Sequence, residues 1–302
     1  LGEYTQYGFS PHVSQLDKGM ELFAEFFDSP TFPEIDLERG IILEEYYEEL
    51  NEEGINVDIN NHACKLLYPE TPISWPTIGT EATIKAMNVE MLRDYYNDHY
   101  IPGNMVLAVS GPIEHDFNLS VAKKYFSNFS NVVPPVTKKH FIGSIPEAQA
   151  QPQFLFQQDS DSQIELQICF RSCSYNHEDF LTMGLISRIF DDGFTSRLQR
   201  VLREERGLVY SVECRATSMS DIGTMDFDVT VRPEKLIEVT RVLLEEIKTF
   251  ITHGPTDYEV AHVKKRYMFD LDSELDDPYK QVVRYAFPHL YSEELSVEEE
   301  RN

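Results

Sequence analysis

The sequence predicts an α+β fold divided between two related halves. Its 302 residues are enough for about two domains. Segments with helical periodicity and segments with strand-like alternation follow one another along the chain, and a proline-rich stretch separates them near the middle. The order strand, helix, break, helix also recurs after about 220 residues. We therefore expect two homologous sheet-and-helix domains.

The first half reads as one opening strand, four helices and a buried strand. Residues 3–13 carry spaced aromatic and aliphatic side chains and predict the opening strand. The run 105–110 is almost wholly apolar and ends at a Gly-Pro turn, which indicates a buried strand. Apolar residues spaced by three and four predict the helices, which we place at 17–28, 34–50, 88–100 and 117–129.

The second half contains more strands. We expect a helix that is capped by Thr195 or Ser196, runs to Arg206 and stops at Gly207, since glycine favours the left-handed position after a helix. The remaining strands and helices follow from the same periodicities: strands at 163–170, 208–214 and 224–231, and helices at 180–190, 234–251 and 256–270.

Domain boundaries follow from the prolines and from the repeat. We place the N-terminal domain at 1–135, a linker at 136–152 and the C-terminal domain at 153–302. About seventy residues of strands and helices precede the strand 224–231, whereas its counterpart begins at residue 3. The repeat therefore predicts that the first copy lacks its opening and that the second stops short of its end.

Composition excludes several classes of protein. The chain has 52 acidic and 26 basic residues, a formal charge of −26, and its cations are scattered, so it would repel nucleic acid and anionic membrane surfaces. No apolar run approaches the length of a spanning helix. The four cysteines include no Cys-x-x-Cys pair, which argues against a disulfide scaffold or a structural zinc site.

Two groups of residues are candidates for chemistry. Glu38 and Glu45 are seven residues apart, close to two turns, and so share one face of a helix. Periodicity alone also fits a solvated charged face. Arg203 and Tyr210 flank the turn at Gly207, where both could grip a peptide backbone. The alternative is that Arg203 pairs with a neighbouring carboxylate and Tyr210 lies in the core.

Four stretches in order carry a family resemblance. They are DSPTFPEIDLERGIILEEYYEEL, PTIGTEATIKAMNVEMLRDYYNDHYIPGNMVLAVSGPIEHD, DDGFTSRLQRVLREERGLVYSV and DIGTMDFDVTVRPEKL. Together they resemble the insulinase-like zinc metallopeptidases, peptidase family M16, in its bacterial and mitochondrial-processing-peptidase branch. The resemblance implies two homologous domains that close as a clam shell over a chamber, and a zinc-dependent endopeptidase acting on peptides or unfolded polypeptides.

The resemblance also assigns roles to residues. In that family two histidines of a His-x-x-Glu-His helix and a later glutamate hold zinc. Glu45 matches the glutamate ligand and Glu38 the glutamate that supports it, while Arg203 and Tyr210 match residues that reach the substrate from the second domain. One chain carries both sets, which implies a single active polypeptide that can pair with a second copy of itself.

The departure from the family pattern is the missing histidine motif. None of the nine histidines begins a His-x-x-Glu-His, so no catalytic residue is visible in this chain. We expect the motif about thirty residues before Leu1, on the family's spacing. The alternative is a non-catalytic homologue that keeps the chamber as a binding or scaffold subunit.

Overall fold

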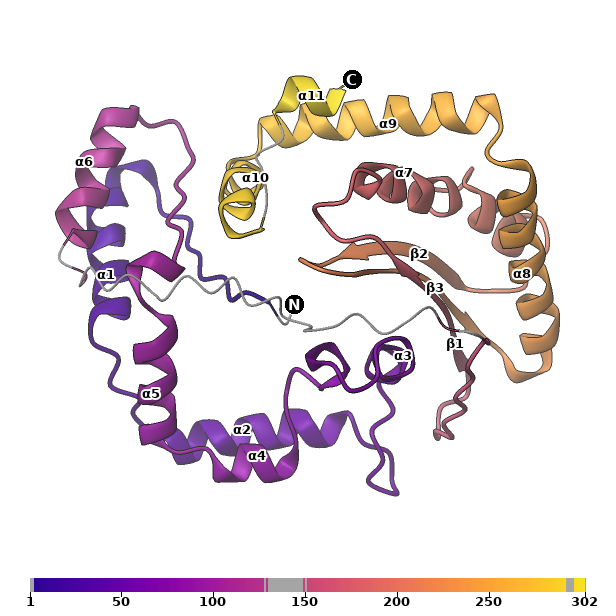
Figure 1. The fold of residues 1–302 in the computed structure, drawn as a ribbon, viewed down its shortest axis with the longest axis horizontal. Coiled ribbons are helices and arrows are strands. Elements are labelled where there is room, and N and C mark those ends of the chain that lie inside the picture. The colour runs from indigo at the N-terminus through magenta and orange to yellow at the C-terminus, as the bar shows by residue number, and fades with distance from the viewer. Residues whose placement is uncertain (1–2, 128, 130–148, 150, 292–295, 302) are drawn as a thin grey trace.

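The computed structural model describes residues 3–127, 129, 149, 151–291 and 296–301. The first half forms an arc of helices, and the second half, with a small sheet and its covering helices, closes the other side of the molecule (Figure 1). The linker expected at 136–152 lies almost wholly outside the described residues, so the domain boundaries stay predictions. Among the described residues, no helix is long and apolar enough to cross a bilayer.

A three-stranded antiparallel sheet organises the second half. It consists of β1 (Ile164–Ser172), β2 (Ser211–Ser218) and β3 (Gly223–Val231), with β3 in the centre. Burial alternates along β3, because successive side chains point to opposite faces. The apolar face, which includes Phe227 and Val229, forms the main core with α7 (Phe180–Phe190) and α8 (Leu236–His253).

Helices complete both halves. The second half continues with α9 (Asp257–Leu275), α10 (Pro278–Tyr291) and α11 (Val297–Arg301). The first half contains α1 (Leu16–Asp28), α2 (Ile35–Glu48), α3 (Ile59–Leu67), α4 (Glu81–Ala86), α5 (Val89–His99) and α6 (His115–Phe126). The helices expected from periodicity are confirmed to within a few residues, and 180–190 to the residue.

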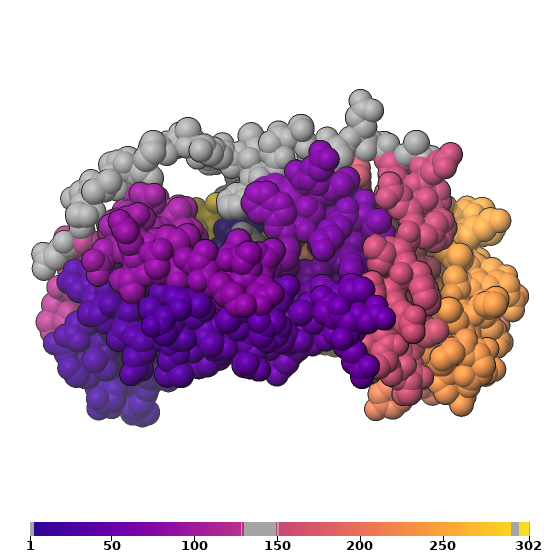
Figure 2. Space-filling model, turned by 90° about the horizontal axis from the view of Figure 1, so that it is seen from below, coloured from indigo at the N-terminus to yellow at the C-terminus, as the bar shows by residue number. Residues whose placement is uncertain are grey.

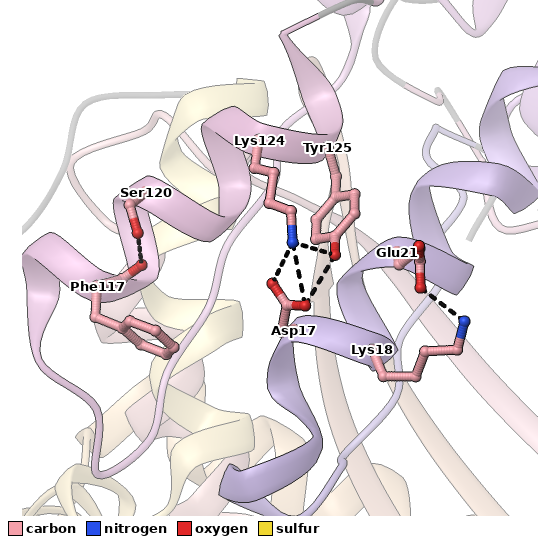
Figure 3. Close-up of polar contacts among 7 residues, drawn as sticks. All are labelled: Asp17, Lys18, Glu21, Phe117, Ser120, Lys124 and Tyr125. Carbon is pink, nitrogen blue, oxygen red and sulfur yellow. Dashed lines mark hydrogen bonds and ion pairs between the residues drawn. The ribbon is translucent and has the colours of Figure 1, made fainter.

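Helices α1 and α6 pack together in the first half. Met20 and Val121 are buried in their shared apolar cluster. Beside this cluster, Lys124 Nζ lies 2.9 Å from Asp17 Oδ1, and Tyr125 Oη donates a hydrogen bond to the same carboxylate (Figure 3). These hydrogen bonds lower the pKa of Asp17, with that from Lys124 the largest cause. The contact fixes the two ends of the first half against each other.

Both strands expected in the first half are absent. Residues 4–12 and 105–110 have no regular structure, although their sequences alternate or are apolar. A strand needs backbone hydrogen bonds from a neighbour, and within the described residues neither segment has one. Tyr7 and Phe9 instead pack against α1, with ring centroids 5.2 Å from Phe27 and 4.9 Å from Phe23. The repeat therefore holds for the helices but not for the sheet.

Helix α3 joins the halves by packing on the face of the sheet opposite α7 and α8. The buried Tyr68, just after α3, donates a hydrogen bond of 2.6 Å from its hydroxyl to the Gly223 carbonyl. Arg171 Nε donates to the Leu67 carbonyl at 2.8 Å. Figure 2 shows the same junction from below, where the first half meets the second. The two halves are thus in direct contact through α3 and β1.

Candidate functional site

Helix α2 carries Glu38 and Glu45, and both side chains are exposed. Their spacing places them on one face of the helix, as expected. Within the described part of the chain, neither carboxylate has a hydrogen-bond or ion-pair partner. Both can therefore accept a ligand or a cation without first giving up another contact.

Other residues of α2 hold the helix in place. Arg39 Nη2 donates to the Met87 carbonyl at 2.6 Å, just after α4. Tyr47 Oη donates to Glu81 Oε1 of α4 at 2.8 Å. Hydrogen bonds from Lys85 and Tyr47 lower the pKa of Glu81. Since these contacts use residues off the Glu38–Glu45 face, they orient that face without occupying it.

The segment expected as an ordinary helix before Gly207 is partly a π-helix, Gln199–Glu204. Glu205 N donates to the Arg200 carbonyl at 2.8 Å, a spacing of five residues. Wide turns of this kind are rare and are often found at functional sites. Gly207 has φ +57°, so the predicted left-handed stop is confirmed.

Arg203 and Tyr210 flank this turn and are both accessible. Tyr210 is 80% exposed, so the alternative of a core tyrosine is wrong. The Arg203 side chain is 42% exposed, and its Nε lies 3.9 Å from Glu204 Oε1, at the outer limit of an ion pair. Its guanidinium also lies 5.8 Å from the ring centre of the exposed Phe194. These weak contacts leave the guanidinium free to bind a carbonyl or a carboxylate.

A buried ion pair anchors the start of the same helix. Arg197 is 7% exposed, and its Nε and Nη2 donate to the two carboxylate oxygens of Glu259 at 2.5 and 2.8 Å. Burial raises the pKa of Glu259, but hydrogen bonds from Arg197 and Thr256 outweigh burial and lower it to about 2. Sequence reasoning missed this pair. The Thr-x-x-Glu capping box of Thr256 and Glu259 was readable, but the partner 62 residues away was not.

The candidate residues form two pairs, one in each half. Glu38 and Glu45 share α2, and Arg203 and Tyr210 flank the Gly207 turn. Among residues that the structure describes, no three His, Cys, Asp or Glu side chains form a cluster suited to a metal ion. A catalytic zinc site needs three protein ligands, so the described residues by themselves do not make one.

Helices on both faces of a small antiparallel sheet, beside a second helical half, make up a mixed α+β fold. A protease from Helicobacter pylori has this fold, with a TM-score of 0.78 at 18% identity over 92% of this chain and 67% of that one. The family model described as "Peptidase M16 inactive domain" matches residues 86–267. The chain belongs to this family, and the resemblance seen in the sequence is confirmed.

Two relatives extend the comparison. An uncharacterized zinc protease of Bacillus subtilis is 23% identical over 284 residues, which cover 93% of this chain and 67% of the relative. The β subunit of the bovine mitochondrial-processing peptidase is 25% identical over 289 residues, covering 91% of this chain and 56% of that subunit. The chain thus spans about two thirds or less of the length of each.

Proposed function

We propose that this chain is part of a zinc-dependent metalloendopeptidase that cuts peptides or unfolded polypeptides. In this proposal the first half supplies Glu45 as a metal ligand, with Glu38 supporting it, and the second half supplies Arg203 and Tyr210 to the substrate. The observation that carries the proposal is the exposed pair Glu38 and Glu45 on α2, which has no partner among the described residues, in a family whose relatives include named zinc proteases.

The metal site needs ligands from beyond these 302 residues. A carboxylate is a normal zinc ligand, so Glu45 fits the metal, but two further ligands are required. The printed sequence contains no His-x-x-Glu-His to supply them. A bound zinc ion would lower the pKa of a coordinated water toward about 7. The residues of this chain would complete the ion's coordination and orient the substrate beside it.

Arg203 and Tyr210 are suited to orienting the substrate. The guanidinium offers paired donors that can hold a peptide carbonyl or carboxylate. The Tyr210 hydroxyl, on a side chain turned to solvent, can donate to the oxyanion that develops when the peptide carbonyl is attacked. We place both at the wall of a chamber between two homologous domains, 1–135 and 153–302, which is the clam shell expected from the resemblance.

Two observations favour a second function. The matching family model describes an inactive domain, and this chain has no His-x-x-Glu-His. A non-catalytic homologue would use the same chamber to bind polypeptides or to support a catalytic partner. In that case Glu45 and Tyr210 would have no effect on chemistry.

Metal analysis of the full-length protein separates the two functions. We expect one zinc per chain and peptidase activity in the unmodified protein. Glu45→Gln should lose most of the zinc and the activity, because an amide is a much poorer ligand than a carboxylate. Glu44→Gln is the matched control, since it makes the same change one residue away, about 100° around the helix.

The zinc measurements distinguish the metallopeptidase from the non-catalytic homologue. Equal zinc content in Glu45→Gln and Glu44→Gln, with unchanged circular dichroism, would make the acidic face of α2 a solvated surface. A full-length protein that binds no zinc would support the scaffold function.

A further inference from the structure

Two of the four cysteines lie at the junction of α3 and β1. Cys64 is on α3 and Cys169 is on β1, and both are half-buried. Cys214 lies on the other face of the sheet, in the main core, where its Sγ is 3.5 Å from Met225 Sδ. Cys173 is four residues after Cys169, about 13 Å along an extended chain. Cys64 and Cys169 are therefore the pair of thiols that the fold brings to a single contact.

Hydrogen bonds fix α3 along β1 on both sides of the two cysteines. At the start of the helix, Asn60 Oδ1 accepts a hydrogen bond of 3.1 Å from Gln167 Nε2. At its end, the Leu67 carbonyl accepts one of 2.8 Å from Arg171 Nε. The helix and the strand therefore run in the same direction across this contact, in a register that both bonds set.

The spacing within each element places the two thiols opposite each other. Cys169 is two residues after Gln167, so it shares that residue's face of β1 and lies about 7 Å further along the strand. Cys64 is four residues after Asn60, so it shares that residue's face of α3 and lies about 6 Å further along the helix. Since both are counted from one hydrogen bond, the two cysteines are level to within about 1 Å along the contact.

The surroundings of the two thiols keep them protonated. Cys169 packs against the cluster formed by the buried Leu67 and Tyr68, and its register partner on β3 is Asp226. Burial raises the pKa of both the Cys64 and Cys169 thiols, and the carboxylate of Asp226 raises it further. Cys64 is a smaller cause of the shift at Cys169, as expected of neighbouring groups. The thiolate is the reactive form, so the reduced pair reacts slowly.

We propose that Cys64 and Cys169 are a site of reversible disulfide formation that joins α3 to β1, with a small-molecule disulfide as the oxidant. Cys64 belongs to the first half of the molecule and Cys169 to the second. The bond therefore links the two halves covalently at the contact that hydrogen bonds and apolar packing hold in the reduced protein.

The reaction consists of two thiol–disulfide exchanges. One protein thiol loses its proton, and its thiolate attacks a sulfur of the oxidant. This step forms a mixed disulfide and releases half of the oxidant as a thiolate, which takes up a proton. The second protein thiolate then attacks the protein sulfur of the mixed disulfide and releases the other half in the same way. Two protein thiols are oxidised, and one small disulfide is reduced to two thiols.

The disulfide is expected to stabilise the fold. The two cysteines are about 105 residues apart in the sequence, so the bond closes a long loop and restricts the unfolded chain. For a protein of this size, we expect the melting temperature to rise by about 5 °C on oxidation.

Oxidation of the full-length protein tests the proposal. The folded protein is incubated with hydroxyethyl disulfide, free thiols are alkylated, and the tryptic peptides are identified by mass spectrometry. We expect a linked pair of peptides containing Cys64 and Cys169, a mass lower by two hydrogens, and the higher melting temperature. Dithiothreitol should reverse all three changes.

Serine variants provide the controls. Cys64→Ser and Cys169→Ser, on two different elements, should each abolish the linked peptides and the rise in melting temperature. Cys173→Ser makes the same substitution four residues further along the chain and should retain both. Circular dichroism of the reduced variants checks that each one is folded.

Three results would overturn the proposal. The first is a folded protein whose Cys64 and Cys169 thiols both stay free after oxidation. The second is a mixed disulfide with the oxidant at either cysteine that does not close to the linked form. The third is a linked peptide in which either cysteine is joined to a different one. None depends on zinc or peptidase activity, so the proposed function can fail without affecting this inference.

Discussion

Two arginines six residues apart have opposite environments. Arg197 is buried and held by both oxygens of Glu259, whereas Arg203 is nearly half exposed and has only a distant contact with Glu204. A buried charge needs a close partner, so Arg197 is committed to structure. The exposed Arg203 guanidinium keeps most of its hydration and remains available to a ligand. The same residue type is therefore held in a buried ion pair at one end of the helix and left accessible at the other.

Changes to the exposed residues Arg203 and Tyr210 are expected to affect turnover without affecting the stability of the fold. If the proposed peptidase function holds, Tyr210→Phe in the full-length protein should lower kcat by about 10²-fold to 10³-fold, the range for losing one donor to an oxyanion. Arg203→Ala should mainly raise KM. Steady-state kinetics on a peptide library, with zinc content and melting temperature measured in parallel, checks both. Wild-type turnover in Tyr210→Phe, or a loss matched by a lower melting temperature, would remove the pair from the site.

The buried ion pair of Arg197 with Glu259 makes the free energy of unfolding depend on pH. Glu259 has a pKa of about 2 in the fold against an ordinary value of 4.5, so its stabilisation is present above pH 4.5 and disappears as pH falls toward 2. Glu259→Gln should lower the free energy of unfolding by about 2–4 kcal/mol at pH 7, and by much less near pH 2. Urea unfolding at several pH values measures the difference.

Glu205→Gln is the control for that measurement. Glu205 pairs with Arg200 at 2.9 Å, but both side chains are about half exposed. Such a pair contributes less than about 1 kcal/mol, so this variant should change little at either pH. An equal loss in both variants would mean that burial of the Arg197 pair adds nothing.

At the scale of elements, α3 is one of the contacts that join the halves. Its last turn delivers Leu67 and Tyr68 to the sheet, where they pack with Ile222. Burial raises the pKa of Tyr68 to about 12, so its hydroxyl stays protonated and can donate to the Gly223 carbonyl. One short helix thus gives both an apolar and a hydrogen-bonded contact.

Removing that hydrogen bond should weaken the junction. Tyr68→Phe leaves the buried Gly223 carbonyl without this donor and should cost about 1–2 kcal/mol in the free energy of unfolding. Tyr47→Phe removes a hydrogen bond of similar length to Glu81, but on the surface, and should cost much less. Similar losses in the two variants, measured by chemical denaturation, would show that α3 does not hold the halves together.

The helices and strands also show which secondary structure the periodicity of the sequence can predict. The helices that were expected were placed well because their hydrogen bonds join residues four apart, so one segment contains the whole pattern, whereas α3, α4 and α10 were not expected. Segments 4–12 and 105–110 have strand-like sequences but no strand, since a strand's hydrogen bonds come from another segment. Their apolar side chains pack on helices or remain partly exposed.

At the scale of the whole molecule, the described residues group no further His, Cys, Asp or Glu ligands with Glu45, so the proposed zinc site is incomplete among them. One carboxylate from Glu45 does not hold zinc tightly without nitrogen ligands. Residues 1–302 expressed alone should therefore bind no stoichiometric zinc and cleave no peptide. Metal analysis by mass spectrometry checks this, and one tightly held zinc per chain would contradict it.

The sequence by itself determined features that depend on near neighbours: most of the helices, the Gly207 stop, and the shared face of Glu38 and Glu45. Motif order also determined the family. Only the tertiary structure decided that Tyr210 is exposed, that Arg197 pairs with Glu259, and that α3 docks on β1. Those depend on residues far apart in the chain, because burial, ion pairing and strand formation each require a partner that local periodicity does not identify.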